Sequence, residues 1–254
     1  MQSPSLGPDV LGHRAKIGVI VPATNTVVQP EYESMRVDGV TNHVSRMTLP
    51  VRPYDDMARY REALDTEEGD LEQAIRLVTC CEPDIIAHGH SIHSFRGDAQ
   101  RAMASQERLA KVAGVPFVTP SVAVLKGLEA IGNPRRLGVL TPYWPPADDL
   151  VAGFFRASGY EVVRVDGLKC QGPTNVARTP LAAIKAGFAS VDHPDVEALV
   201  HVGTNLPVTG ITQELEDELG KPLIGVNVAT YWLALRTLGL KDRKAGFGKL
   251  LAEC

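Results

Sequence analysis

The 254-residue chain has little of what marks metal scaffolds, disulfide scaffolds, membrane spans or nucleic-acid binders. Its four cysteines lack the spacing of a zinc site and the density of a disulfide framework. The net charge is −4, and no basic block supplies the phosphate contacts that nucleic acids need. No apolar run approaches the ~20 residues of a membrane span, and residues 1–15 lack the apolar core of a signal peptide. We therefore expect a cytoplasmic protein that binds neither nucleic acid nor membrane.

What the chain does have is an internal repeat. Three segments return in the same order: residues 16–25 as 136–143, residues 84–91 as 198–205, and residues 114–121 as 220–227. Each is a run of Ile, Val and Leu that ends in Gly, Pro, Thr, Ser or Asn, the pattern of a buried parallel strand followed by a polar loop. Ligands bind at that end of open parallel sheets. The repeat predicts two pseudo-symmetric α/β halves with an active-site cleft between them.

Each half is predicted to hold a parallel four-stranded sheet flanked by helices. The expected strands are residues 16–21, 43–49, 84–87, 116–119, 137–140, 161–165, 198–202 and 222–225. Helices are expected from Pro30, over 71–80, between Gly97 and Ala113, and over 121–130 and 228–238. We assign residues 1–118 to the first half and 119–226 to the second, with 227–254 packing back on the first. A homo-oligomer is compatible with this organisation.

Polar side chains follow the predicted strands at matching places in both halves. They are Thr24, Asn25, Thr26, Ser91, Tyr143, Thr204 and Asn205. Short hydroxyl and amide groups, together with the free N–H groups of helix starts, make a neutral cradle for a carboxylate or an enediolate. Taken singly, each of these residues fits a helix cap or a turn equally well. Taken as matching clusters, they predict a site for a small carboxylate.

At these loops the chain resembles the aspartate/glutamate racemase superfamily, and within it the branch of maleate cis-trans isomerases and arylmalonate decarboxylases. The resemblance covers residues 16–240 and is carried by the loops 22–26, 89–97, 141–143 and 203–205. It implies a cofactor-independent enzyme that acts on a carboxylic or dicarboxylic acid, with a cysteine at the third strand end of each half. Here those positions are Gly89 and Gly203. Arylmalonate decarboxylases share the first glycine, whereas the second departs from the family.

Histidine is the notable replacement near the first glycine, in His88, His90 and His93. His90 follows Gly89 directly and is predicted to line the cleft, where a near-neutral imidazole can transfer a proton. The same histidines also fit a structural role, or a metal site of imidazole ligands. We take His90 and Tyr143 as candidate catalytic residues and expect neither metal nor cofactor. Gly89, Gly203 and the other polar loop residues named above are the candidate substrate-binding residues.

The predicted function is isomerase or lyase chemistry on a small carboxylate substrate, with His90 in place of a cysteine. Two alternatives remain open. Loss of both thiols would leave a non-catalytic carboxylate-binding protein, and the His88, His90 and His93 cluster would suit a metal-dependent lyase. Arg52 and Arg96 lie in loops near the same edge, where they could pair with a second carboxylate or simply be solvated.

Overall fold

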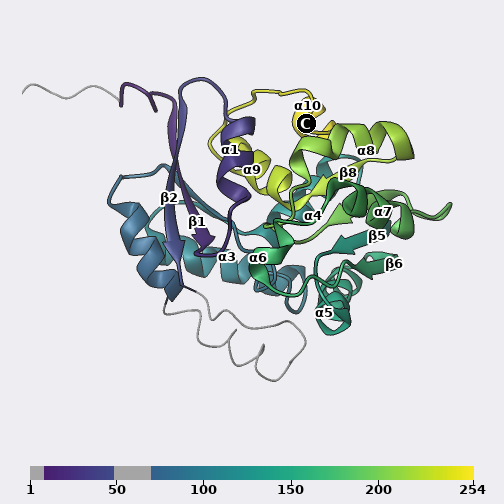
Figure 1. The fold of residues 1–254 in the computed structure, drawn as a ribbon. Coiled ribbons are helices and arrows are strands. Elements are labelled where there is room, and N and C mark those ends of the chain that lie inside the picture. The colour runs from purple at the N-terminus through teal and green to yellow at the C-terminus, as the bar shows by residue number, and fades with distance from the viewer. Residues whose placement is uncertain (1–8, 49–69) are drawn as a thin grey trace, which may run out of the picture.

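Two parallel sheets lie side by side in the computed structural model, which describes residues 9–48 and 70–254 (Figure 1). The first sheet has the order β2-β1-β3-β4, and the second has the order β6-β5-β7-β8. The strands of the first are β1 (Ala15–Pro22), β2 (Val40–Met47), β3 (Ile85–His88) and β4 (Phe117–Val118). Those of the second are β5 (Arg136–Thr141), β6 (Glu161–Gly167), β7 (Ala198–His201) and β8 (Leu223–Gly225). The predicted fold is confirmed.

The central strands are apolar over most of their length because helices cover both faces of each sheet. In β1, Ile17, Val19 and Ile20 are completely buried, as are Leu137 and Val139 of β5. The second strand begins at Val40, three residues before the expected start, and Arg52 lies outside the described residues. All eight predicted strands are present.

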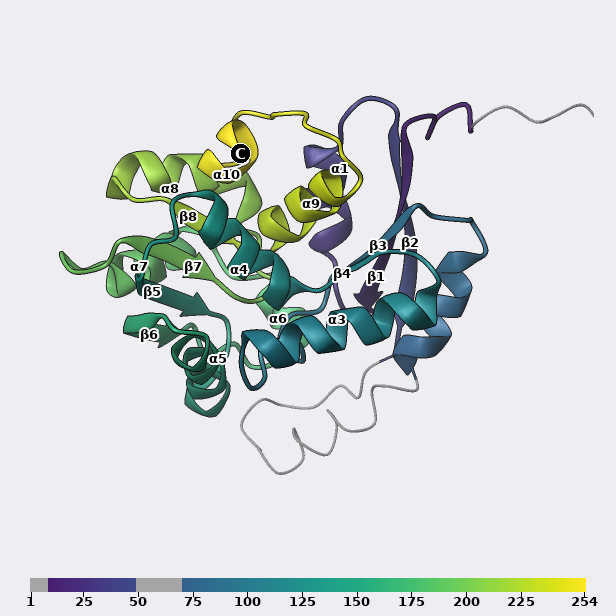
Figure 2. The same cartoon turned by 180° about the vertical axis from the view of Figure 1, so that it is seen from behind.

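Helices of the first half cover its sheet on opposite faces (Figure 2). Residues 70–79 are helical, and with α3 (Ala99–Ala113) they pack against Ile20, Ile86 and Phe117. Asp98 caps α3 by accepting a hydrogen bond from the Arg101 N–H at 2.9 Å. On the other face lies α1 (Val28–Met35). Among the helices of the described residues, none is long and apolar enough to cross a membrane.

The second half contains helices that the sequence did not delimit. They are α5 (Pro145–Ala157), α6 (Pro173–Val176), α7 (Leu181–Val191) and α8 (Thr212–Leu219), the last preceded by the 3-10 turn η1 (Thr209–Ile211). Helix α5 joins the two cores, because Phe154 and Phe155 contact Phe95 of the first half at ring-centroid distances of 5.1 and 5.7 Å. This aromatic group helps to hold the halves together.

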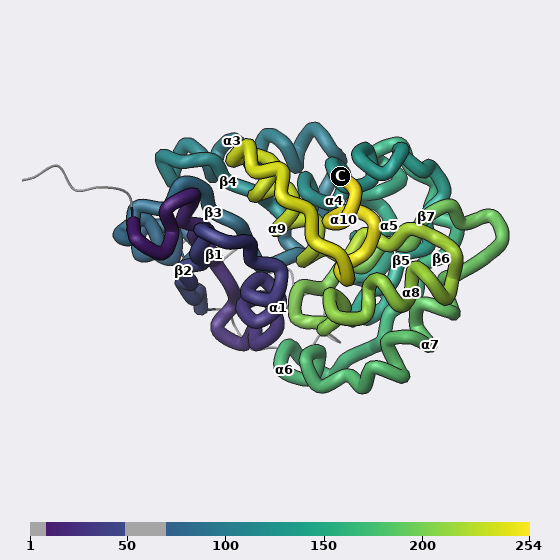
Figure 3. Tube along the Cα trace, turned by 90° about the horizontal axis from the view of Figure 1, so that it is seen from above, coloured from purple at the N-terminus to yellow at the C-terminus, as the bar shows by residue number. Residues whose placement is uncertain are grey.

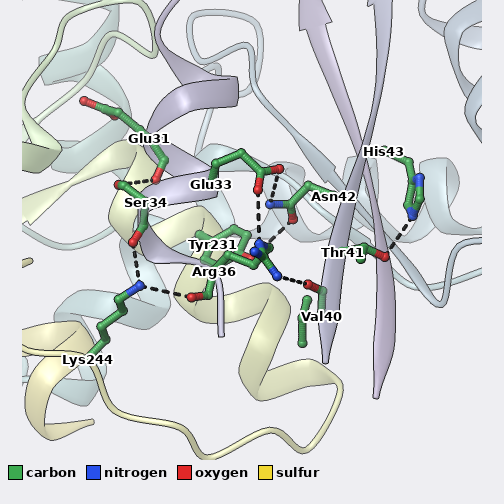
Figure 4. Close-up of polar contacts among 10 residues, drawn as sticks. All are labelled: Glu31, Glu33, Ser34, Arg36, Val40, Thr41, Asn42, His43, Tyr231 and Lys244. Carbon is green, nitrogen blue, oxygen red and sulfur yellow. Dashed lines mark hydrogen bonds and ion pairs between the residues drawn. The ribbon is translucent and has the colours of Figure 1, made fainter. Parts of the chain in front are cut away.

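The C-terminal segment lies between the halves (Figure 3). Helix α9 (Val226–Thr237) packs against α1, β3 and β4 of the first half and against α4 (Pro120–Ala130), and α10 (Lys249–Glu253) follows it. Figure 4 shows polar ties to the first half: Tyr231 donates to Asn42 at 3.3 Å, and the Lys244 ammonium donates to the Ser34 carbonyl at 2.6 Å. The boundaries at residues 118 and 226 stay a prediction.

Candidate active site

The predicted carboxylate-binding residues meet where the carboxyl ends of the two sheets face each other. The Ser91 and Tyr143 hydroxyls are hydrogen-bonded at 3.0 Å, and the Thr204 N–H donates to Ser91 Oγ at 3.3 Å. The Thr204 hydroxyl donates to the Gly89 carbonyl at 2.9 Å. With Asn25, we call these residues the inter-half cluster. Its bonds join elements that are more than fifty residues apart in the sequence.

Asn25 serves both as a helix cap and as a member of this cluster. Its Oδ1 accepts from the N–H groups of Val27 and Val28, at 3.0 and 2.9 Å, so it caps α1. Its Nδ2 reaches the Thr204 hydroxyl at 3.5 Å. The buried side chain is thereby held at the boundary between the halves.

Two further predicted residues, Thr26 and Asn205, connect these loops nearer to solvent. The Thr26 N–H donates to Asn205 Oδ1 at 2.9 Å, and Asn205 Nδ2 donates to the Pro173 carbonyl at 2.8 Å. Thr26 is exposed and Thr24 is only part-buried. The structure therefore brings Asn25, Ser91, Tyr143 and Thr204 into one buried group and places Thr24 and Thr26 nearer to solvent.

Tyr143 keeps a neutral hydroxyl, and Thr141 and Asp148 position its backbone. Burial raises the pKa of Tyr143, so its hydroxyl keeps its proton. The Tyr143 N–H donates to Thr141 Oγ1 at 2.9 Å, and the Thr141 hydroxyl in turn donates to Asp148. Burial also raises the pKa of Asp148. Thr141 was visible in the repeated Thr-Pro-Tyr strand end, but no sequence pattern marked Asp148.

A second group of hydrogen-bonded residues, which the sequence did not predict, binds the backbone of Thr204. Asn227 Nδ2 donates to the Thr204 carbonyl at 2.9 Å and to Glu31 at 2.7 Å. Glu31 also accepts from the Thr209 N–H at 3.0 Å. Burial raises the pKa of Glu31 to about 7, despite these donors. The signal for Asn227 was its place at the end of the third repeated segment.

Both glycines at the resembled cysteine positions are closed to larger side chains. A Cβ at Gly89 would lie 2.8 Å from Val21 Cγ1 and 2.9 Å from Val28 Cγ1. At Gly203 it would lie 2.6 Å from Pro142 Cγ, and the φ of +155° strains any other residue. The space next to each backbone is filled by this chain's own side chains. A thiol fits neither position without movement of those neighbours.

The two third strands pair with their central strands in matching ways. His88 lies opposite Ile20 in the first sheet, and His201 lies opposite Leu140 in the second. Ile20 and Leu140 occupy the same place in the first repeated segment. His88 and His201 are therefore equivalent under the pseudo-symmetry.

This register corrects the expected match between the two glycines by one residue. The equivalent pairs are Gly89 with Val202, His90 with Gly203, and Ser91 with Thr204. A shift of one residue moves a side chain to the opposite face, which is why the two glycines have different surroundings. Two equivalent residues, Ser91 and Thr204, bond to each other across the boundary.

His90 lines a cavity of about 360 Å³ between the end of β3 and helix α3. His88 and His93 line it too, with ring centroids 6.0 and 4.4 Å from that of His90. The residues that line this cavity include none of the inter-half cluster. Burial lowers the pKa of His88 to about 4 and the pKa of His90 and His93 well below their usual range. All three imidazoles are therefore neutral near pH 7.

His201 is enclosed in the second half. Its side chain is buried, and burial lowers its pKa to about 3. Within residues 9–48 and 70–254, no group of three or more His, Cys, Asp or Glu side chains is arranged to hold a metal ion. The described residues therefore give the metal-dependent alternative no ligand set.

Cys170 is a thiol near the inter-half cluster. It is part-buried, its N–H donates to the Pro142 carbonyl at 3.0 Å, and its thiol lies 3.5 Å from the Thr179 hydroxyl. Cys170 is a suitable control position for any test of thiol chemistry in this protein.

The comparisons with known proteins agree on one enzyme group. The sequence profile of arylmalonate decarboxylase matches residues 17–251. A maleate isomerase of Pseudomonas putida is 27% identical over 248 residues, covering 93% of this chain and 97% of that protein. An arylmalonate decarboxylase of Bordetella bronchiseptica is 28% identical over 171 residues, covering 65% and 69%. The solved structure of Nocardia farcinica maleate cis-trans isomerase superposes with a TM-score of 0.84 at 22% identity, covering 94% and 98%. A mutant of that isomerase holds a covalent succinylcysteine intermediate.

Proposed function

Because the chain belongs to the arylmalonate decarboxylase family, we propose that it is a cofactor-independent enzyme that transfers a proton beside the carboxylate of a small carboxylic or dicarboxylic acid. The inter-half cluster holds the carboxylate and His90 moves the proton. The observation that carries this proposal is the meeting of Ser91, Tyr143 and Thr204 at the carboxyl ends of both sheets.

Three donors of the inter-half cluster suit a carboxylate. The Ser91 hydroxyl lies within hydrogen-bond reach of the Tyr143 hydroxyl, at 3.0 Å, and of the Thr204 N–H, at 3.3 Å. A carboxylate that enters exchanges these mutual bonds for bonds to its own oxygens. The same donors then stabilise the extra negative charge of an enediolate, because they need not reorient as the charge develops.

His90 suits the role of base in this chemistry. Its lowered pKa leaves the ring neutral, with one nitrogen able to accept a proton. A substrate anion nearby raises that pKa and so favours proton uptake. The C–H bond beside the carboxylate breaks, its electron pair enters the carboxylate as an enediolate, and the proton passes to His90. Return of the proton to another face or carbon gives an isomer.

This route differs from the one that the relatives' names suggest. Maleate isomerase forms a succinylcysteine, a step that needs a thiol, and positions 89 and 203 carry none. Decarboxylation remains the second candidate, supported by the family profile. It requires a proton donor, and so a protonated His90. The two reactions predict opposite pH profiles: base chemistry speeds up as pH rises through the pKa of His90, and acid chemistry slows down.

The test is a panel of small mono- and dicarboxylates, including maleate and aryl-substituted malonates, incubated with the protein in D2O. Proton NMR reports deuterium incorporation, isomerisation and loss of carbon dioxide in one measurement. We expect exchange or isomerisation of at least one acid. If no acid in a broad panel is exchanged, isomerised or consumed, the enzyme proposal fails, and calorimetric binding of the same acids then supports a carboxylate-binding protein.

His90→Ala is expected to lower turnover by about a hundredfold or more, the usual loss when a positioned acid or base is removed. His193→Ala, at a part-exposed histidine of the second half, is the matched control. Cys170→Ala tests whether the Cys170 thiol, rather than His90, transfers the proton. Normal turnover in the His90 variant, or abolition by Cys170→Ala alone, would overturn the assignment of the proton to His90.

A further inference from the structure

The cavity between β3 and α3 is separate from the inter-half cluster and has its own chemistry. Its volume is about 360 Å³, large enough for a small organic ion. Three arginines line it: Arg96, Arg101 and Arg108. Among the described residues that line it, none is an aspartate or a glutamate. The described part of the wall therefore carries positive charge.

Two buried polar atoms in the wall have no hydrogen-bond partner within the described residues. They are His88 Nε2 and Ser121 Oγ, on side chains that are 4% and 0% exposed. A buried polar group without a partner is costly, so such groups mark places where a ligand or water completes the bonding. Ser121 also lies in the first turn of α4, whose N–H groups and dipole favour an anion.

We propose that this cavity binds a small dianionic oxyanion, either a dicarboxylate or a phosphate. Arg96 and Arg101 supply the charge, and Ser121 donates a hydrogen bond. His88 Nε2 donates in the tautomer that carries its proton there. Guanidinium groups match the paired oxygens of carboxylate and phosphate. This site does not depend on the proposed reaction, since binding here requires no turnover at the inter-half cluster.

His90 connects this site to the cluster, because its ring lies in the cavity wall while its neighbours in sequence, Gly89 and Ser91, belong to the cluster. An anion in the cavity therefore lies beside the proposed proton carrier. An anion bound in the cavity would therefore affect the inter-half cluster through one residue, His90.

The experiment titrates the full-length protein with inorganic phosphate, malonate, maleate and acetate, by calorimetry and by NMR of the histidine rings. We expect one dianion per chain, shifts at His88, His90 and His93 but not at His193, and acetate at least about tenfold weaker. Preference for phosphate or for the dicarboxylates identifies the source of the ligand. No shift at those three histidines with any dianion overturns the proposal.

Variants assign the binding to the arginines. Arg96→Gln combined with Arg101→Gln should weaken dianion binding by more than about tenfold, whereas Lys at both positions should retain most of it. Ser121→Ala should weaken it by about threefold. Arg156→Gln, at an exposed arginine of α5, is the control and should bind as the parent does. Circular dichroism checks folding, and unchanged binding in the double Gln variant overturns the proposal.

Discussion

The third strand ends in a histidine in both halves, yet the residues after that histidine and the space around it differ. In the first half, His88 faces the cavity beneath α3, and the next two residues are Gly89 and His90. In the second half, His201 is enclosed, and Gly203 packs against Pro142 where the first half has His90. The first end thus carries titratable groups beside open space, and the second is closed. The two halves share the same backbone pattern, whereas the side chains at the two strand ends differ in their surroundings.

The largest expected effect is a loss of stability in acid, which comes from the two equivalent histidines, His88 and His201. The folded-state pKa is about 4 for His88 and about 3 for His201, against about 6.5 in the unfolded chain. The unfolded state therefore binds protons first as pH falls, so stability is complete above about 6.5 and is lost toward pH 4. We expect a loss on the order of 3 kcal/mol from each, measured by urea denaturation.

Single variants decide whether the two histidines differ as the comparison requires. His201→Leu should flatten the acid profile more than His88→Leu, because only His88 faces a cavity. His193→Leu serves as the control. Equal flattening by the two variants would mean that the two strand ends have the same surroundings.

Smaller effects are expected from restoring a thiol. Gly203→Cys must displace Pro142 and adopt a strained φ, and we expect about 1–3 kcal/mol of destabilisation by urea denaturation. Gly89→Cys meets the side-chain ends of Val21 and Val28, with the Ile20 carbonyl oxygen 3.2 Å away, and should cost less because its φ is not strained. Gly153→Ala, in an open position of α5, should be neutral or stabilising. A Gly203→Cys protein as stable as the parent would show that the second strand end is not closed.

The smallest effect concerns Glu31, which ties α1 of the first half to Thr209 of the second half and to Asn227 at the start of α9. The pKa of Glu31 is raised to about 7, whereas the pKa of each histidine is lowered. The contribution of Glu31 to stability is therefore complete below about 4.5 and is lost as pH rises through 7. We expect about 1–2 kcal/mol, because the carboxyl is only part-buried. Glu31→Gln should remove this alkaline loss and Glu33→Gln, on the same helix, should not. A parent protein equally stable at pH 6 and pH 8 would contradict this account.

Much of the fold could be predicted because its signals are local. A strand buried on both faces must be largely apolar, so the apolar runs of the central strands were clear signals. The edge strands β2 and β6 mix polar and apolar residues and were found from the alternation of strands and helices. Four helices of the second half, α5 to α8, were not delimited. One of them, α5, begins with two prolines and buries Asp148, which breaks the simple apolar spacing of a surface helix.

The candidate site could be predicted in part, for a physical reason. Parallel strands end at one edge of a sheet, so Asn25, Ser91, Tyr143 and Thr204 were expected to converge, and the structure brings them together. Glu31 could not be found this way, because nothing in its own segment shows that Thr209 and Asn227 approach it.

The order of residues along the chain was enough to establish the repeat, the succession of strands, and the replacement of both resembled cysteines by glycine. Three features required the packed molecule: the register that makes His90 the equivalent of Gly203, the closure of the two glycine positions by Val21, Val28 and Pro142, and the arginine-lined cavity. Periodicity along a chain determines which residues share a face. Which faces meet, and what space they leave, depends on packing between segments distant in sequence.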